Sequence, residues 1–213
     1  MGEARLAPAF EDAAFDVVAI ACSAGGQAAL RKLLGGLPDR FPAAVVVLLH
    51  WPAGKPLKLI SMERVSVLPV TLAQTGQSLE PATVFFAAPG GHLLIAPNGG
   101  FLLSQTPRLH FVRPSADLLF ESLAASYGER AIAVILTGLG FDGSIGVRSV
   151  KAAGGTVIAQ NPATAAYCSM PEAAIETGCV DHVLSLQQIA PTLVSLVNQQ
   201  HNQQSAGARK PAG

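Results

Sequence analysis

Apolar residues fall in short unbroken runs along the chain, separated by segments in which apolar and polar positions alternate with helical spacing. Three of the runs, at 16–22, 44–49 and 131–137, are rich in Val, Ile and Ala. Runs of this kind are typical of strands that are buried on both faces of a parallel sheet. Shorter runs predict further strands at 67–71, 83–87, 156–159 and 180–184.

Helical spacing predicts helices at about 24–34, 115–126, 144–153, 171–177 and 186–197, while the segment 57–64 is of uncertain helicity. Ser115 is a plausible N-cap of its helix, and Asp117 complements the positive end of that helix. The segments 92–96 and 101–104 flank Pro97-Asn98-Gly99-Gly100, a strong hairpin signal. The pattern predicts an α/β fold: a three-layer α/β/α domain, with a doubly wound, mainly parallel sheet and one antiparallel hairpin.

The chain of 213 residues is long enough for one domain with a sizeable core. We expect this domain to span residues 15–197. Residues 1–14 are expected to be a flexible lead-in, and residues 198–213, which have lost apolar periodicity, a disordered tail.

Composition narrows the classes of function. Hydrophobic residues make up 50% of the chain, charged residues 13%, and the formal net charge is +0, so we expect no nucleic-acid partner. Three cysteines without C-x-x-C spacing argue against a disulfide framework and favour a reducing compartment. Neither a secretory signal nor a long apolar segment is visible, and we therefore expect a cytoplasmic protein without membrane insertion.

Three of the predicted strands lead to side chains that together form a candidate hydrolase triad. Ser23 and His50 directly follow two of the runs, and Asp142 follows the third after a glycine-rich stretch. In open α/β sheets, sites form beyond the carboxyl ends of the strands, so these side chains can converge. A serine nucleophile needs a base within hydrogen-bond reach and an acid that orients that base, which are the roles of His50 and Asp142.

Each of these residues has a structural alternative. Ser23 and Asp142 both precede predicted helices and could be ordinary N-caps, whereas His50 is a poor core residue at the end of an aliphatic strand. Cys22, beside Ser23, is expected to serve packing, with a rival nucleophile as the lesser alternative. We expect His92 to be a turn residue, with a place in the lining of the crevice as the alternative.

The glycine-rich segments after two strands admit a phosphate-binding alternative. Neither 23–27 nor 137–143 matches a dinucleotide or P-loop pattern. We expect instead that backbone amides there form an oxyanion hole, with Ala24, Gly138 and Leu139 as candidate oxyanion or site-lining residues. His110, His182 and His201 form no metal-binding pattern. No metal and no organic cofactor are expected.

An ordered set of motifs resembles the CheB-type chemotaxis protein-glutamate methylesterase domain. The motifs are IACSAGG (20–26), LHWP (49–52), APGGHL (88–93), RPSADLLF (113–120), ILTGLGFDG (135–143), AQN (159–161) and SMPEAAI (169–175). The resemblance implies a serine esterase that hydrolyses γ-glutamyl methyl esters on cytoplasmic helices of chemoreceptors or similar receptors and releases methanol. It also implies deamidation of particular glutamines. The family's catalytic residues fall on Ser23, His50 and Asp142.

The chain departs from the family pattern at Cys22, Ala24, Trp51 and Leu139, where Ala or Gly, Thr, Met and Met are more usual. Full-length members carry a phosphoacceptor receiver domain before the catalytic domain, and only about 15 residues precede the first strand here. We therefore expect a free-standing, constitutively open domain. The alternative is a regulatory or binding module that keeps the fold and has weak or no turnover.

Overall fold

The computed structural model describes residues 16–51 and 59–198. The predicted lead-in, 1–14, and all of the predicted tail except its first residue lie outside the described residues. A seven-stranded sheet forms the centre, and all of its paired strands are parallel. Its strands are β1 (Val17–Cys22), β2 (Ala44–Leu49), β3 (Val70–Leu72), β4 (Val84–Phe86), β7 (Ala131–Ile135), β8 (Thr156–Gln160) and β9 (His182–Leu184).

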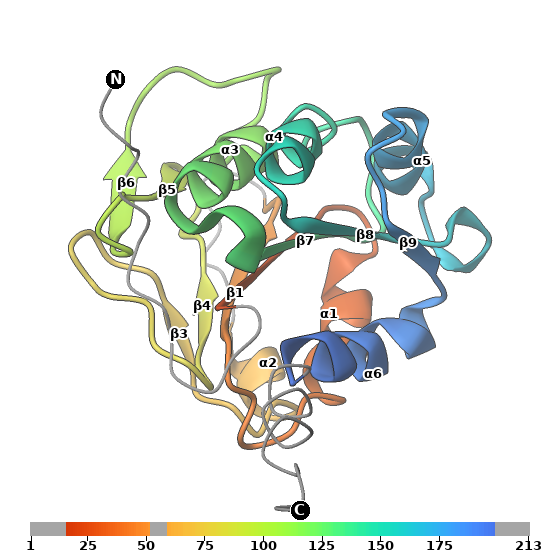
Figure 1. Cartoon of the computed structure of the whole chain (residues 1–213), viewed down its shortest axis with the longest axis horizontal. Coiled ribbons are helices and arrows are strands. Elements are labelled where there is room, and N and C mark those ends of the chain that lie inside the picture. Colours follow the sequence, from red (N-terminus) through yellow and green to blue (C-terminus); the bar gives the residue numbers. More distant parts are fainter. Residues whose placement is uncertain (1–15, 52–58, 199–213) are drawn as a thin grey trace, which may run out of the picture.

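Helices cover both faces of this sheet (Figure 1). One face carries α1 (Gly26–Leu34), α2 (Ile60–Glu63) and α6 (Leu186–Val197), and the other carries α3 (Ala116–Tyr127), α4 (Gly146–Ala152) and α5 (Ser169–Glu176). Short 3-10 turns cover Gly128–Arg130 and Pro162–Thr164. The predicted three-layer α/β/α class is confirmed.

The predicted hairpin forms a separate two-stranded antiparallel sheet of β5 (His92–Ile95) and β6 (Phe101–Ser104). Gly99 has a φ of 80° and its amide donates to the carbonyl of Ala96, a conformation that glycine adopts without steric cost. This hairpin packs beside α3.

Alternating residues of β1 belong to two different cores. Val17, Ala19 and Ala21 lie in the core under α3, α4 and α5, whereas Val18, Ile20 and Cys22 lie in the core under α1 and α6. All six side chains are fully buried. This double burial explains why the strand is apolar at every position and not only at every second one.

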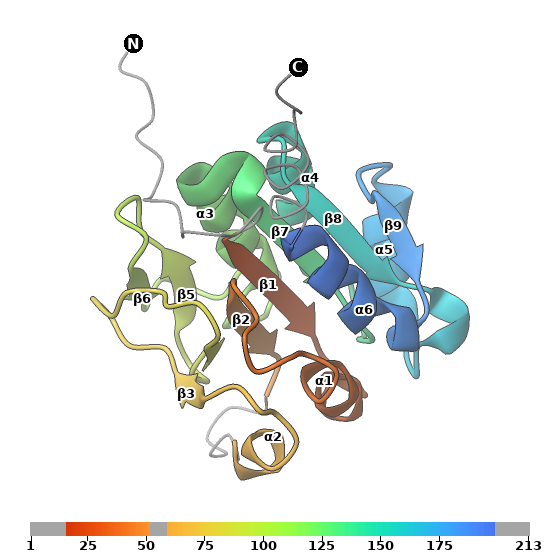
Figure 2. The ribbon, with the colours of Figure 1, turned by 60° about the horizontal axis from the view of Figure 1, so that its bottom comes forward.

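The order of the strands, β3-β4-β2-β1-β7-β8-β9, reverses its direction of winding at β1. After β1 the chain moves outward through β2, and it later returns to lay β7 on the opposite side of β1. Ligand sites of open α/β sheets lie at such a switch point, beyond the carboxyl ends of the strands. Figure 2 shows β1 and β2 side by side, with α1 following β1 at this end of the sheet.

Several predicted boundaries differ from the structure by one to three residues, and two of these differences have a clear local reason. β3 begins at Val70 and not at residue 67, because Pro69 has no N–H to donate to a sheet. The first helix begins at Gly26 and not at residue 24, because Gly25 adopts a left-handed φ of 76° that ends the preceding turn.

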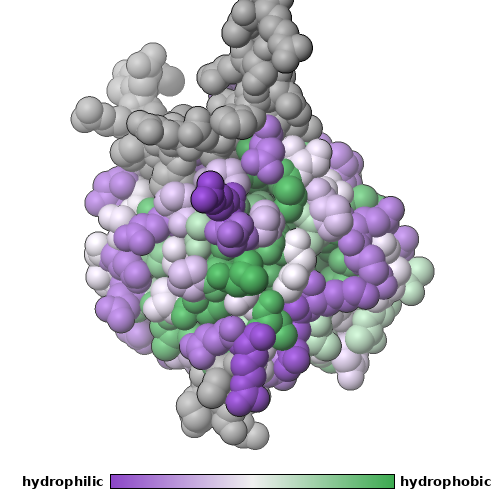
Figure 3. Space-filling model, turned by 90° about the horizontal axis from the view of Figure 1, so that it is seen from below, coloured by the Kyte–Doolittle hydropathy of each residue, from purple (hydrophilic) through white to green (hydrophobic). Residues whose placement is uncertain are grey.

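The surface over α2 and α6 mixes hydrophobic and hydrophilic residues (Figure 3). Leu186, Val194 and Leu196 of α6 are only partly buried there against the core beneath. Within the described ranges, none of the helices combines the length and the apolar character that crossing a membrane requires.

Candidate active site

The structure brings the three predicted triad residues to one end of the sheet. Because Cys22 pairs with Leu49 in the parallel register, Ser23 and His50 follow directly on neighbouring strands. The amide of Ser23 donates to the carbonyl of Thr137 at 3.0 Å, which ties the end of β1 to the segment after β7. Ser23 and His50 line one cavity of about 510 Å³, together with Ala24, Gly25, Gln27, Ala28, Leu49 and Trp51.

His50 and Asp142 form a direct hydrogen bond. Nε2 of His50 lies 2.8 Å from Oδ2 of Asp142, and the two side chains are 15% and 5% exposed. An ionised carboxylate only accepts, so the imidazole Nε2 carries the hydrogen and donates it. In the neutral ring Nδ1 is then the unprotonated nitrogen, available to accept a proton from the cavity side.

The carboxylate of Asp142 is held by four donors, of which His50 is one. Its Oδ1 accepts from the Ser115 hydroxyl at 2.8 Å and from the Asp117 amide at 3.3 Å, and its Oδ2 also accepts from the Ala116 amide at 2.6 Å. Burial alone would raise the pKa of Asp142. The bonds from His50, Ala116 and Ser115 outweigh burial and hold the pKa below its ordinary value. The carboxylate is therefore ionised at neutral pH.

The N-cap position predicted for Ser115 is confirmed, whereas the capping alternatives for Ser23 and Asp142 are not. Ser115 occupies the N-cap position of α3 but its side chain makes no capping bond, because its hydroxyl donates to Asp142. Asp142 does not cap the helix that follows it; it receives the first amides of α3. Ser23 is not the N-cap of α1, since Gly25 holds that position. Neither Ser23 nor Asp142 is therefore the N-cap of the helix that follows it.

Asp117 has a role that its position in the sequence did not suggest. Its Oδ1 accepts from the amides of Ile145 at 3.0 Å and Gly146 at 2.8 Å, so it caps α4 and not its own helix. Its Oδ2 is buried and meets no hydrogen-bond partner in the described parts of the chain. Burial, together with the nearby charge of Asp142, raises the pKa of Asp117.

His92 is a buried strand residue, and the prediction of a turn residue is wrong. It begins β5 and is fully inaccessible to solvent. Its Nδ1 accepts from the amide of Ser115 at 3.1 Å, and its Nε2 donates to the carbonyl of Pro107, also at 3.1 Å. His92 therefore supports the residue that holds Asp142 and does not line the crevice.

Cys22 points away from the cavity. Its side chain belongs to the core under α1, and a Cβ on Gly26 would come within 2.7 Å of its sulfur. Complete burial raises the pKa of the Cys22 thiol far above its ordinary value. A buried thiol of this kind stays protonated and unreactive, so its contribution is packing.

The three oxyanion or site-lining candidates differ in what their amides do. Gly138 lies against the nucleophile, since a Cβ there would be 3.0 Å from the Cβ of Ser23, and its amide donates to the carbonyl of Tyr167 at 3.0 Å. The amides of Ala24 and Leu139 meet no acceptor in the parts of the chain that the structure describes. Ala24 lines the cavity, and Leu139 is 58% exposed.

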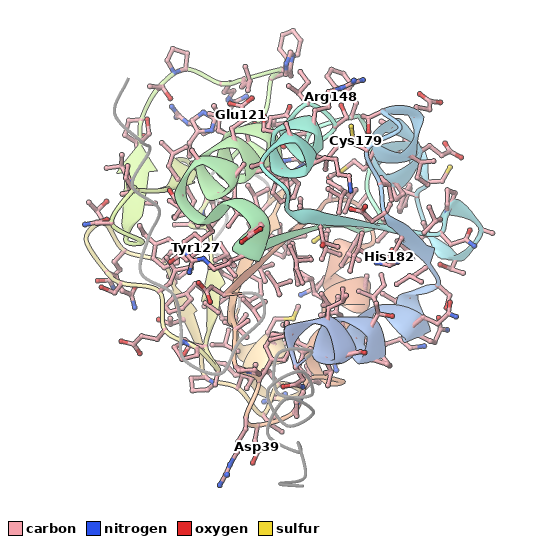
Figure 4. The ribbon with its side chains drawn as sticks, viewed as in Figure 1. Asp39, Glu121, Tyr127, Arg148, Cys179 and His182 are labelled. Carbon is pink, nitrogen blue, oxygen red and sulfur yellow. The ribbon has the colours of Figure 1, made fainter. Side chains whose placement is uncertain are left out.

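The other histidines lie apart. His182 lies on the edge strand β9, and Cys179 follows the turn after α5 (Figure 4). His201 falls outside the described residues. No cluster of three or more His, Cys, Asp or Glu side chains with the spacing of a metal site occurs within 16–51 and 59–198.

An exposed aromatic turn borders the site, and the sequence did not single it out. Leu109 and Val112 exchange both backbone hydrogen bonds, at 3.2 and 2.9 Å, around His110 and Phe111. Both central residues have positive φ, 47° and 68°, which costs a non-glycine residue about 1 kcal/mol each. Phe111 is 93% exposed. The sequence carries no signal for this reversal, because neither Asn nor Gly stands at its two central positions.

A second, smaller cavity of about 160 Å³ connects this turn with the triad. It shares His50 and Trp51 with the larger cavity, and its other lining residues are Arg108, Phe111, Val112 and Arg113. The ring of His110 contacts Phe141, the residue before Asp142, with ring centroids 5.3 Å apart.

Comparison with known proteins identifies relatives along most of the chain. The family model for CheB methylesterase matches residues 18–193. A protein of Moorella thermoacetica named protein-glutamate methylesterase/protein-glutamine glutaminase is 42% identical over 187 residues, which are 85% of this chain and 44% of that protein. A Burkholderia pseudomallei protein of the same name, numbered 2, is 39% identical over 202 residues, which are 94% of this chain and 58% of that protein. The chain thus spans about half the length of these relatives.

A solved structure gives the same result for the fold. The crystal structure of the Thermotoga maritima CheB methylesterase catalytic domain superposes with a TM-score of 0.83 at 37% identity. The match covers 86% of this chain and 100% of that one.

Proposed function

Since this chain belongs to the CheB methylesterase family, we propose that it is a protein-glutamate methylesterase in which Ser23 is the nucleophile, His50 the general base and Asp142 the acid that orients it. The observation that carries the proposal is the 2.8 Å bond between His50 and Asp142 at the wall of a cavity that Ser23 also lines.

The geometry supports a two-step reaction. The Nδ1 of His50 takes the proton of the Ser23 hydroxyl as its oxygen attacks the ester carbonyl, and the imidazolium so formed is stabilised by the ionised Asp142. The same proton passes to the departing methoxide, which leaves as methanol. A water molecule then attacks the acyl-enzyme along the same route and restores the serine with release of the free carboxylate.

The negative charge on the attacked carbonyl oxygen needs donors that are already in place. The amides of Ala24 and Leu139 are the two candidates whose hydrogens meet no acceptor among the described residues. Gly138 contributes by its lack of a side chain, because any Cβ would press on Ser23 and on Met170. We assign the role of oxyanion donors to the amides of Ala24 and Leu139. The role of Gly138 is to let its backbone lie close to Ser23.

The same machinery would act on a glutamine side chain, since ammonia replaces methanol as the leaving group and needs the same proton from His50. The names of the relatives from Moorella thermoacetica and Burkholderia pseudomallei include a protein-glutamine glutaminase activity. We propose that this chain deamidates glutamines of the substrate as its second reaction. Its substrates are proposed to be methylated chemoreceptors or similar signalling proteins.

The test is release of methanol from membranes that contain methylated receptors. Ser23→Ala should lower the rate by a factor of about 10³ or more, as loss of a serine nucleophile does. Ser149→Ala, on the partly exposed side of α4, is the matched control and should keep the wild-type rate. Equal rates for wild type and Ser23→Ala would remove Ser23 as the nucleophile, and no release by wild type would reject the esterase.

A further inference from the structure

The aromatic turn of His110 and Phe111, beside the site, carries backbone strain that burial within the fold does not offset. His110 and Phe111 both hold positive φ angles, and the bulky Phe111 adopts such an angle far less readily than asparagine or glycine does. Phe111 is 93% exposed, so its ring gains almost no burial from the position it takes. Strained residues of this kind are retained mainly at functional sites.

The turn lies next to the reacting groups and is held there. The loop between β6 and α3 arches over α3 toward α4 (Figure 1), and the ring of His110 meets Phe141, next to Asp142. The Nη1 of Arg113 donates to the carbonyls of Gln105 at 3.3 Å and Thr106 at 3.1 Å, which fixes the base of the loop. Phe111 and His50 line the same small cavity.

The charge on the surface around the small cavity is positive. Arg108 and Arg113 both line the small cavity, and none of its lining residues is acidic. Arg108 is exposed and has no partner within the described residues. A cation beside an exposed ring fits a partner that presents a carboxylate next to an apolar side chain.

We propose that Phe111 and Arg108 form a docking rim for the methylated polypeptide and determine its specificity: Phe111 packs on an apolar side chain near the esterified glutamate, and Arg108 pairs with a neighbouring carboxylate. The proposal rests on the methylesterase function proposed above and names the features of the substrate outside its ester. A small ester carries neither the apolar side chain nor the neighbouring carboxylate. The docking rim should therefore affect kcat/KM on the polypeptide and not on the small ester.

The decisive measurement compares two esters. One is N-acetyl-glutamate γ-methyl ester amide, and the other is a synthetic helical peptide with one glutamyl γ-methyl ester, a leucine four residues away and a flanking glutamate. In Phe111→Gly the ratio of kcat/KM on the peptide to kcat/KM on the small ester should fall about tenfold, as expected for loss of one apolar anchor. Glycine suits the positive φ of this position and no packing is lost, so the variant should fold.

Ala82→Gly is the matched control. Ala82 is another non-glycine residue with positive φ, 54°, and it lies before β4, at the opposite end of the sheet from the site. Its replacement should leave the ratio at the wild-type value. Arg108→Gln should lower the ratio about threefold at low salt, and the effect should vanish when the flanking glutamate of the peptide is replaced by glutamine.

If the ratio of kcat/KM on the peptide to kcat/KM on the small ester stays within twofold of wild type in Phe111→Gly, the proposal is overturned. This holds also when kcat/KM falls equally on both esters. A second measurement separates this failure from that of the proposed function. The same peptide with glutamine in place of the ester, labelled with a fluorophore, should bind Ser23→Ala about tenfold more tightly than Ser23→Ala/Phe111→Gly. Equal binding by the two would overturn the docking rim even if the chain had no esterase activity.

Discussion

Asp142 caps α3, the helix that contains Asp117, and Asp117 caps α4, the helix that follows Asp142 in the chain. The carboxylate of Asp142 receives the amides of Ala116 and Asp117 at the start of α3, and that of Asp117 receives the amides of Ile145 and Gly146 at the start of α4. Asp142 thereby joins two functions, since the same carboxylate bonds to His50. Substitution of Asp142 should therefore lower both the free energy of unfolding and the rate of turnover.

Asp142→Asn should show both effects. We expect methanol release to fall by about 10³- to 10⁴-fold, because the amide cannot hold the imidazole in the required tautomer. The free energy of unfolding should fall by about 1–2 kcal/mol through loss of a charged cap. Urea denaturation and the methanol assay measure the two. Asp181→Asn is the control: Asp181 also accepts a backbone amide, that of Val157 at 2.9 Å, and its loss should lower stability alone. Full activity in Asp142→Asn would contradict the assignment.

Ser115→Ala should change how stability depends on pH. The folded pKa of Asp142 lies below its ordinary value, so this group stabilises the fold above about pH 4 and the contribution is lost as pH falls through the folded pKa. Without the Ser115 hydroxyl the folded pKa moves up toward the ordinary value. We expect a loss of about 2 kcal/mol at pH 7 that shrinks steadily below pH 4 in urea titrations.

The control for Ser115 is Ser126→Ala. Ser126 is equally buried, and its hydroxyl donates to the carbonyl of Ile95 at 3.1 Å. A carbonyl does not titrate, so the loss of stability in Ser126→Ala should be the same at pH 3.5 and pH 7. If the effect of Ser115→Ala is equally flat across pH, its bond to Asp142 does not contribute to the lowered pKa.

Gly138→Ala should disturb the site through a steric clash. The new Cβ would lie 2.2 Å from the sulfur of Met170 and 3.0 Å from the Cβ of Ser23, and overpacking of this kind costs about 1–3 kcal/mol. Activity should fall because Ser23 is displaced. Met170→Ala removes the closest clash, so the double variant should lose less stability than the sum of the two single losses. Strict additivity in thermal unfolding would show that the two residues do not compete for this space.

Cys22→Ala should leave methanol release near the wild-type rate. The thiol is fully buried in the core under α1, and burial raises its pKa, so it supplies neither a nucleophile nor a charge to the site. The loss of packing should cost about 1 kcal/mol of unfolding free energy. A collapse of activity with intact folding would instead make Cys22 part of the reaction.

The repeating parts of the fold were predictable because each reflects one local rule. Continuous apolar runs located the central strands of the sheet, and β2, β6 and α6 were placed with their observed bounds. The convergence of Ser23, His50 and Asp142 also followed, since the carboxyl ends of parallel strands share one edge.

The connections between distant residues were not predictable from local patterns. Ser115 has the sequence context of an N-cap, and only the approach of the 138–142 loop gives its hydroxyl a stronger acceptor in Asp142. The partner of His92 is likewise an amide 23 residues away. The positive φ angle of Phe111 runs against the preference of a bulky residue, and the pair His110-Phe111 lacks the Asn or Gly that marks a two-residue reversal, so no propensity argument could have found the turn.

The order of the strands has a consequence for synthesis of the protein. Ser23 and His50 are synthesised before Asp142 and lie on strands that pair directly, whereas Asp142 is made 92 residues after His50 and reaches them only when β7 pairs with the free edge of β1. A nascent chain that ends before β7 holds a serine and a histidine without their carboxylate. The chain thus gains its complete set of reacting groups only when its second half has folded onto the first.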